Sequence, residues 1–475
     1  MVEEFQINAK DNIALEDLVR QEYRGYQIYT LMDRAIPYLQ DGLKPGQRRI
    51  LFTLFRNQNK GLIKVSAATG LVLTLHPHGP ASIESTIVNL AQDYTFANNY
   101  PLIDKKGYFG ERMETSPAAG RYIECKVGAV AKILLFDDMN QINMVPNYDE
   151  KVLEPEALLP KLPLMLLNGA EGIGTGFSSN IPSFGHKDVI ASMISFIQKG
   201  KAKKIKPHVN NYSLPIQVDK QGKLQFAMTF KKRDGQIFIT ELPRGYDATK
   251  IYRHLTKFID KDYLKDFIDS SVGNEILIEL LFKRGQTPPL AEVEKTIGIT
   301  SSMVPNYTLI SAGGVRIFSR PEEIIELFTA QRLEVVRIRY ELLAADYRKK
   351  IKLNNEVVRF IRQKHYVEAT KTKNRKTFVL HLEKNKFTCC DYLADMSIYR
   401  MTKDEVAKRK LLIKEDTAEL KRCEKIAASP ALVKKNLIME LEDVKDRLNR
   451  WLKDQERDRV AAAAPVRRTR KKKGK

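Results

Sequence analysis

The chain has 475 residues, of which 43% are hydrophobic and four are cysteines. The length corresponds to roughly two to four domains, and the apolar fraction is typical of globular proteins, so disorder over most of the chain is excluded. With 80 Lys and Arg residues against 58 Asp and Glu residues, the formal net charge is +22. Such an excess favours a polyanionic partner such as nucleic acid, because binding releases condensed counterions.

The sequence offers neither a membrane span nor an export signal. No apolar run approaches the roughly 20 residues that a membrane-spanning helix needs, and the start, MVEEFQINAKDN, lacks the segments of a signal peptide. The cysteines form no C-x-x-C pair, which predicts reduced thiols and no metal cluster. We therefore expect an intracellular protein.

The last ten residues, VRRTRKKKGK, are strongly basic and hold seven positive charges. The rest of the chain still carries a net charge of +15, so the excess is not confined to this tail. The tail is either a solvated solubility segment or localisation signal, or a flexible arm that tethers DNA, and both interpretations stay open.

The first 60 residues predict two helices. Apolar positions recur at helical spacing until Pro37 stops the first helix. The segment DGLKPGQRRILFTLF then predicts a basic loop that leads into a helix with Pro45 at its start and Arg48 and Arg49 in its first turns. A helix-turn-helix or winged-helix element begins in this way. From about 62 to 125, short helical patterns alternate with Gly and Pro, which predicts a compact mixed region.

The pattern changes after residue 150. The strand-like runs LPLMLLNG, GQIFITEL, EILIELLF and GVRIFS, between amphipathic helices, predict an α+β domain. From Pro321 to about His365 there is no Gly or Pro, which predicts one long helix of the kind that pairs as a coiled coil. A second helical stretch at about 402–454 is expected to return antiparallel to it, with a small tip at about 366–400.

Two clusters of basic and imidazole groups are candidates for nucleic-acid contacts. The first consists of four residues around a turn: Arg34, Lys44, Arg48 and Arg49. They could neutralise several phosphates, although a basic loop taken alone is more often a solvated face. The second is HPHG, which places His76 and His78 two residues apart in a turn. Taken alone, these histidines are more simply explained as solvated or capping side chains.

The third cluster is AAGRYIE, in which small residues precede Arg121 and Tyr122 and allow another backbone to approach closely. A tyrosine can attack phosphorus if nearby cations offset its pKa of about 10, and the phosphotyrosyl ester keeps the energy of the cleaved bond for rejoining. An adjacent Arg is suited to stabilise the developing charge. A lone Arg-Tyr pair, however, carries no functional meaning.

Together these segments resemble the breakage-reunion subunit of type IIA DNA topoisomerases, the family of gyrase A and eukaryotic topoisomerase II. The resemblance rests on the ordered segments RAIPYLQDGLKPGQRRIL, HPHG followed by STIVNLAQ, NYPLIDKKGYFG and AAGRYIE. It continues through LLNGAEGIGTGFSSNIPSF, ITELPRGYDATKIYRHL, IRYELLAADYRKK and YLADMSIYRMTKDEVAK. The similarity thus covers about residues 20–445.

The resemblance implies a role for each candidate residue. Tyr122 would attack one DNA strand and hold its 5′ end as a phosphotyrosine, while Arg121 and His78 would stabilise the transition state. The duplex that is cut, called the gate segment, would be bound by five residues: Arg34, Lys44, Arg48, Arg49 and His76. Ile173 matches the isoleucine that wedges between base pairs in this family and bends the duplex at an unstacking cost of a few kcal/mol. Without the resemblance, Ile173 would be taken for a core residue.

Some positions depart from the family pattern. GAEGIGTGF is closer to the eukaryotic form than to the gyrase form, and the positions that anchor quinolones in bacterial enzymes are Ala81 and Ser85 here. These replacements predict weak quinolone sensitivity. Gly120 stands in place of the usual alanine before the Arg-Tyr pair.

Two functions of the family have no signature in this sequence. GAEGIGTG lacks the Gly-Lys-Ser/Thr ending of a P-loop, and the only D-x-D, Asp260 to Asp262, lies in a helical pattern without the glutamate motif of a TOPRIM domain. The resemblance therefore implies a separate ATPase/TOPRIM subunit that binds ATP and holds Mg²⁺, which strand cleavage in this family needs. Since the length leaves no room for the DNA-wrapping domain of gyrase A, the chain is most similar to the medium subunit of a phage or viral type II topoisomerase.

Three other interpretations each explain part of the sequence. A non-catalytic DNA-binding or architectural protein with a winged helix is disfavoured by the intact Arg121-Tyr122 pair. A tyrosine recombinase would place dispersed Arg and His residues ahead of a C-terminal tyrosine, which this sequence does not do. A coiled-coil scaffold explains residues 321–454 and nothing before them.

The expected architecture is an α+β multidomain fold. Its expected parts are a helical arm at 1–25, a winged-helix DNA-cleavage domain at 26–150, an α/β tower domain at 151–320, a long antiparallel coiled coil at 321–455 that includes the small dimerisation tip, and a basic disordered tail at 456–475. The resemblance implies a homodimer closed by the long helices, double-stranded DNA as the substrate and no membrane partner. The location would be the host cytoplasm for a phage protein, or the nucleus for a protein of a eukaryote or its virus.

Overall fold

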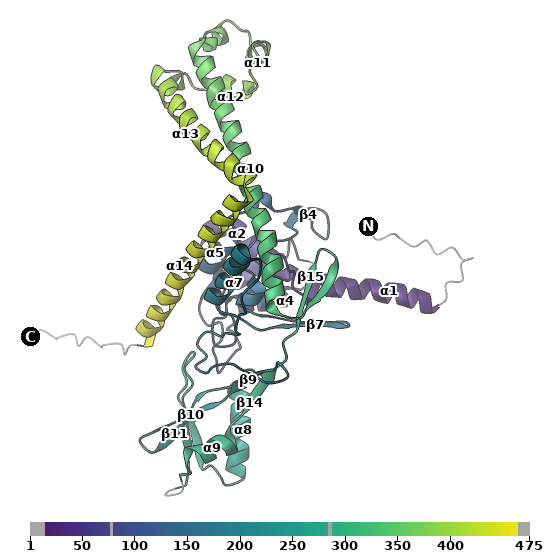
Figure 1. Ribbon diagram of the computed structural model, residues 1–475, viewed down its shortest axis with the longest axis vertical. Coiled ribbons are helices and arrows are strands. Elements are labelled where there is room, and N and C mark those ends of the chain that lie inside the picture. Colours follow the sequence, from purple (N-terminus) through teal and green to yellow (C-terminus); the bar gives the residue numbers. More distant parts are fainter. Residues whose placement is uncertain (1–14, 77–78, 284–286, 464–475) are drawn as a thin grey trace, which may run out of the picture. The chain divides into compact units, whose positions relative to one another are not determined.

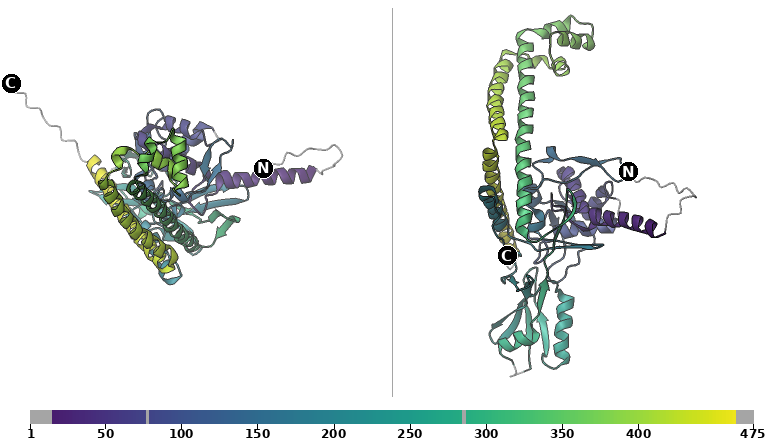
Figure 2. Two further views of the ribbon diagram at one scale, coloured as in Figure 1. Left: turned by 90° about the horizontal axis from the view of Figure 1, so that it is seen from above. Right: turned by 45° about the vertical axis from the view of Figure 1, so that its right-hand side comes forward.

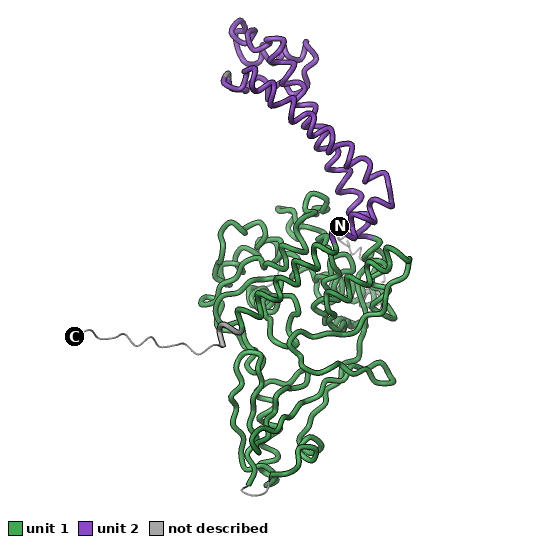
Figure 3. Tube along the Cα trace, turned by 60° about the vertical axis from the view of Figure 1, so that its left-hand side comes forward, with its two compact units in different colours: residues 1–330, 441–475 green, residues 331–440 purple. Residues whose placement is uncertain are grey.

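A computed structural model describes residues 15–76, 79–283 and 287–463. The chain divides into two compact units, which are residues 1–330 with 441–475 (unit 1) and residues 331–440 (unit 2), coloured separately in Figure 3. Within the described ranges, no helix combines the length and the apolar character needed to cross a lipid bilayer. The mixture of helices and small sheets confirms the α+β class predicted from the sequence.

The N-terminal part of unit 1 packs short helices against a small sheet. Its helical elements are α1 (Leu15–Thr30), the π-helical turn η1 (Leu31–Ala35), α2 (Pro45–Arg56), η2 (Gln58–Lys60), α3 (Val65–Val72), α4 (Pro80–Ala91), α5 (Ala129–Leu134) and η3 (Met139–Gln141). Its strands form an antiparallel sheet in the order β1 (Ile63–Lys64), β3 (Glu124–Val127) and β2 (Ile103–Lys106). Helix α1 projects from the rest of unit 1 (Figures 1 and 2).

Helix α2 confirms the predicted start and the predicted apolar face. It begins at Pro45, where the missing amide of proline costs no helical hydrogen bond. Ile50, Leu51 and Leu54 are buried in the core. Phe55 stacks on a ring from a later segment with 4.1 Å between centroids. Residues 48–54 are all buried, so the helix is held by packing around its whole circumference and not along one face.

The middle of unit 1 contains three hairpins and two helices. The hairpins are β4 (Met144–Pro146) with β5 (Leu153–Pro155), β6 (Ala170–Gly174) with β7 (Phe177–Ile181), and β15 (Tyr307–Ser311) with β16 (Gly314–Phe318). The helices are α6 (Leu164–Leu167) and α7 (His186–Lys199). The prediction of a strand at LPLMLLNG was wrong, because that run forms the fully buried helix α6. A short apolar run without alternation does not distinguish a buried strand from a buried helical turn.

The segment 217–303 builds an α/β part of unit 1 with two antiparallel sheets (Figure 1). One sheet has the order β10 (Thr229–Arg233), β11 (Gln236–Glu241), β13 (Ile278–Leu281), β12 (Asp266–Asp269). The other has the order β14 (Thr300–Met303), β9 (Leu224–Ala227), β8 (Gln217–Val218). Helices α8 (Ala248–Asp260) and α9 (Leu290–Ile297) share one apolar core with the first sheet.

Long helices dominate the rest of the chain. They are α10 (Pro321–Arg362), α13 (Lys403–Ala428) and α14 (Pro430–Ala463), joined by η4 (His365–Thr370), α11 (Arg375–Lys384), α12 (Cys390–Ala394) and η5 (Ile398–Arg400). The prediction of one long helix from Pro321 is confirmed. The stretch predicted as one return helix is two, because Pro430 lacks the amide that a continuous helix would need.

Within unit 2, the long helices run antiparallel. Arg348 bonds Glu424 at 2.6 Å, Tyr340 bonds Asn436 at 3.0 Å, and Arg332 bonds Glu440 at 3.1 Å through Nε. Residues nearer the start of α10 bond residues that come later in the chain, so the helices that follow run antiparallel to α10. The tip of unit 2 has its own apolar core, contributed mainly by α10, α11 and α12. The finer domain boundaries given above, including the winged-helix and tower domains, stay predictions.

Candidate functional site

The predicted nucleophile lies on a tight turn that enters the central strand β3. The N–H of Tyr122 donates to the carbonyl of Ala119 at 2.8 Å and closes the turn. The end of β1 and the first turn of α3 hold the tyrosine turn from one side: the N–H of Ser66 donates to the carbonyl of Gly120 at 3.3 Å, and Lys64 Nζ donates to the carbonyl of Tyr122 at 3.3 Å. The backbone of the turn is therefore held by bonds from strand β1 and helix α3.

The side chain of Tyr122 is open to solvent, with an exposed fraction of 65%. The guanidinium of Arg121 lies 4.8 Å from the centre of the tyrosine ring, within the range of a cation–π contact. The structure thus brings together the two residues that the sequence singled out, with the phenol accessible to a large substrate. A phenol beside a cation can act as a nucleophile, since the cation stabilises negative charge on or near the oxygen.

Of the two histidines of HPHG, His76 lies within the described residues. His78 lies outside the described residues. His76 is buried, and its Nδ1 lies 3.2 Å from Nη1 of Arg49. Arg49 in turn forms a bidentate ion pair with Glu154: its Nε donates to Oε2 at 2.7 Å and its Nη2 donates to Oε1 at 2.8 Å. This geometry links His76 to a buried ionic network.

Arg48, like Arg49, is buried and paired with a carboxylate. Its Nε and Nη2 donate to the carboxylate of Asp41 at 2.6 and 3.2 Å, and its guanidinium lies 4.7 Å from the ring centre of Tyr38. Burial alone would lower the pKa of the guanidinium, but the Asp41 carboxylate outweighs burial and raises it. The structure therefore turns Arg48 and Arg49 inward toward carboxylates, whereas the sequence led us to expect them to face phosphates. Their assignment to DNA stays a prediction that this geometry does not favour.

The hairpin β6–β7 carries the predicted wedge. Ile173 has an exposed fraction of 90%, so this large apolar side chain is left almost entirely in solvent. The preceding Gly172 lies so close to η1 that a Cβ there would be 2.0 Å from the carbonyl oxygen of Ala35 and 3.5 Å from Nζ of Lys44. The hairpin is thereby fixed beside Arg34, which is exposed at the end of η1. Burial lowers the pKa of Lys44.

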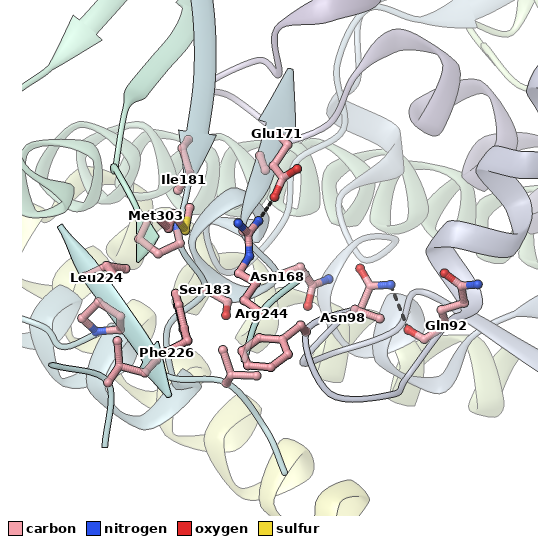
Figure 4. A pocket seen from close by; sticks show the side chains of 18 of the residues that line it. Gln92, Asn98, Asn168, Glu171, Ile181, Ser183, Leu224, Phe226, Arg244 and Met303 are labelled. Atoms are coloured by element: carbon pink, nitrogen blue, oxygen red, sulfur yellow. Dashed lines mark hydrogen bonds and ion pairs between the residues drawn. The ribbon is translucent and has the colours of Figure 1, made fainter. Parts of the chain in front are cut away.

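A polar cavity of about 410 Å³ lies at the base of this hairpin (Figure 4). Its labelled lining includes Gln92, Asn98 and Asn168, and Glu171 of β6 forms an ion pair there with Arg244. The cavity does not include Tyr122. It is therefore an anchoring region of the hairpin and is distinct from the tyrosine turn. The sequence did not single out this ion pair, because its members are far apart in the chain and no local motif connects them.

Metal ligands are not clustered in the part of the chain that the structure describes. No group of three or more His, Cys, Asp or Glu side chains there could hold a metal ion. The four cysteines all lie in the described ranges and are free.

Comparisons with known proteins agree with this picture. The profile of the family that comprises the A subunits of DNA gyrase and topoisomerase IV matches residues 34–442. The gyrase A protein of Brachyspira hyodysenteriae is 29% identical over 473 residues, which cover 88% of this chain and 54% of that protein. The mitochondrial DNA topoisomerase 2 of Dictyostelium discoideum is 31% identical over 362 residues, 74% of this chain and 28% of that protein.

A solved structure shares the fold. The DNA-binding, cleavage and re-ligation domain of Plasmodium falciparum topoisomerase II matches with a TM-score of 0.81 at 24% identity, covering 92% of this chain and 65% of that chain. The fold is thus that of a type II topoisomerase core. The chain belongs to the family of the DNA gyrase and topoisomerase IV A subunits. It spans about half the length of the gyrase relative and less than a third of the topoisomerase 2 relative.

Proposed function

We propose that the chain is the DNA-cleaving subunit of an ATP-dependent type IIA DNA topoisomerase, an isomerase that relaxes or decatenates DNA. The observation that carries the proposal is the exposed Tyr122 with Arg121 over its ring, on a turn anchored to a sheet. Family membership supplies the reaction class, and the turn supplies a nucleophile that a duplex can reach.

In the proposed reaction, the Tyr122 oxygen loses its proton and forms a bond to a backbone phosphorus. The bond from phosphorus to the 3′ oxygen breaks, that oxygen takes up a proton, and the 5′ end stays on the tyrosine. Arg121 and His78 stabilise the charge that develops on the phosphoryl oxygens. Because one ester replaces another, the reverse reaction reseals the strand after a second duplex has passed.

The gate segment is proposed to lie along the surface that joins Arg34, Lys44 and the Ile173 hairpin. Ile173 supplies an apolar wedge between base pairs, and the bend it causes is offset by the extra protein surface the DNA then contacts. Phosphate contacts by Arg34 and Lys44 position the duplex without reading its sequence. The burial of Arg48, Arg49 and His76 favours a supporting role for these three residues beneath this surface.

The partners and cofactors follow from family membership. We propose a homodimer that closes through the tips of the long helices, with one Tyr122 for each strand. We further propose a separate ATPase/TOPRIM subunit that binds ATP and holds Mg²⁺, which polarises the phosphate during cleavage. A phage or viral source, with action in the host cytoplasm or in the nucleus, stays part of this proposal.

Plasmid cleavage tests the proposal. The chain is combined with its ATPase/TOPRIM partner and Mg²⁺, the reaction is stopped with denaturant, and protein-linked linear DNA is measured. Tyr122→Phe should abolish this product and retain DNA binding, whereas Tyr148→Phe, at another exposed tyrosine of unit 1, should not change it. DNA binding without any covalent product, in the presence of an active partner, would instead establish the alternative, a non-catalytic architectural protein. In the same assay, quinolones should trap little cleaved DNA.

A further inference from the structure

The peptide group of Gly120, two residues before Tyr122, is held from two sides. On one side its carbonyl accepts the N–H of Ser66, as described above. On the other side its N–H donates to Oε1 of Glu84 at 2.9 Å. Glu84 belongs to α4, so this carboxylate connects the tyrosine turn to a helix that is distant in sequence. Gly120 itself is buried.

The space beside Gly120 is filled by the same carboxylate. A Cβ at position 120 would lie 2.4 Å from Oε1 and 2.9 Å from Oε2 of Glu84. The φ angle of Gly120 lies outside the left-handed region, so its backbone conformation is open to other residues. Glycine is therefore required here for space and not for conformational freedom.

This contact matters because the nucleophile is positioned through the backbone of its turn and not by core packing. The ring of Tyr122 is 65% exposed, so core packing does not orient it, and Arg121 is itself a surface group. The place of the phenol oxygen is then set mainly by the backbone of the turn. One side of that backbone is bonded to β1 and to the first turn of α3, and Glu84 provides the bond from α4.

We propose that Glu84 is a positioning residue for strand cleavage, which acts through the N–H of Gly120 to place Tyr122 against the scissile phosphate. The inference rests on the proposed function, since it assigns a role within the same reaction. It also explains an acidic side chain beside a DNA-binding surface: the carboxylate is engaged by a backbone amide. Helix α4 begins at Pro80, shortly after HPHG, so the contact ties the turn to the helix that follows the other predicted catalytic segment.

Single-turnover cleavage of a duplex oligonucleotide by the assembled enzyme tests this role. Glu84→Ala should slow formation of the covalent complex by about 10–100-fold, since a displacement of about 1 Å can cost a factor of about 100, and should leave DNA affinity unchanged. Glu84→Gln should restore most of the rate, because an amide oxygen accepts the same hydrogen bond. Ser85→Ala, the next residue on the exposed face of α4, serves as the control. A wild-type rate in Glu84→Ala, or a Glu84→Gln variant as slow as Glu84→Ala, would overturn the proposal.

A double-mutant cycle tests the contact itself. Gly120→Ala should slow cleavage about as much as Glu84→Ala, whereas adding Gly120→Ala to Glu84→Ala should cost nothing further, because the group that the new methyl would strike is gone. Rate losses that multiply would contradict the inference.

Urea unfolding provides a measurement that does not depend on activity. Gly120→Ala should lower the unfolding midpoint in the presence of Glu84 and not in its absence. Failure of the proposed function would appear differently: the wild-type enzyme would form no Tyr122-linked DNA, while the effect of Gly120→Ala on the unfolding midpoint would still depend on Glu84. If Gly120→Ala lowered the unfolding midpoint equally with and without Glu84, the contact would be refuted, and with it the role of Glu84.

Discussion

Replacing Arg48 by alanine is expected to destabilise the folded chain strongly, although the sequence alone suggested a phosphate contact. The carboxylate of Asp41 has no exposed surface, and in the variant it would keep the backbone N–H donors of Leu43 and Leu158, at 3.0 and 3.1 Å. It would lose the guanidinium, whose Nε donates to it at 2.6 Å. A buried carboxylate without its counter-charge costs about 3–5 kcal/mol. The lost stacking of Arg48 on Tyr38 adds about 1 kcal/mol.

The free energy of unfolding in urea measures this loss, with Arg56→Ala as a matched control. Arg56 lies on the same helix two turns further on, and it is exposed. The control should change the free energy of unfolding by less than about 1 kcal/mol. Combining Arg48→Met with Asp41→Asn should recover most of the loss, because no unpaired charge then stays buried.

A DNA-binding measurement separates this reasoning from the phosphate-contact hypothesis. If Arg48 neutralised a phosphate, its removal would reduce the slope of log K against log salt by about 1. An Arg48→Ala variant that unfolds like Arg56→Ala, and whose salt slope is lower than that of the wild type, would refute the structural role. We expect the opposite pair of results.

Three further predictions concern single sites. Burial lowers the pKa of His186 to about 4, so between pH 6.5 and 4 the unfolded chain binds a proton that the folded chain does not, and stability falls as the pH decreases. The loss at about pH 5 should be about 2 kcal/mol in urea unfolding, and an unchanged pH dependence in His186→Gln would contradict this. Gly172→Ala places a methyl group 2.0 Å from the carbonyl oxygen of Ala35 and should destabilise by about 1–3 kcal/mol; equal unfolding midpoints would show that the hairpin adjusts freely. Ile173→Ala should leave stability unchanged, because the side chain is 90% exposed, and should reduce the DNA bend measured by fluorescence energy transfer between duplex ends. If Ile173→Ala bent DNA as much as the wild type does, the assignment of Ile173 as the wedge would be wrong.

Local patterns predicted the elements whose causes are local. The start of α2 at Pro45 and the long helix from Pro321 depend on where proline and glycine occur, and both are confirmed. The strands at GQIFITEL, EILIELLF and GVRIFS correspond to β11, β13 and β16. The run LPLMLLNG was assigned wrongly, because its apolar residues are buried on all sides and show no period that distinguishes a strand from a helix.

The sequence by itself determined the nucleophile candidate, because the ordered motifs around Arg121 and Tyr122 resemble those of a known family, whereas the Arg-Tyr pair alone would not have singled it out. It also showed which residues are charged. Only the tertiary structure decided which of those charges face solvent: it pairs Arg49 with Glu154, 105 residues away, and places Glu84 against Gly120, 36 residues away. The energy of a charged group depends on its desolvation and on the opposite charge it meets. Both are properties of packing between distant segments, and a linear pattern does not contain them.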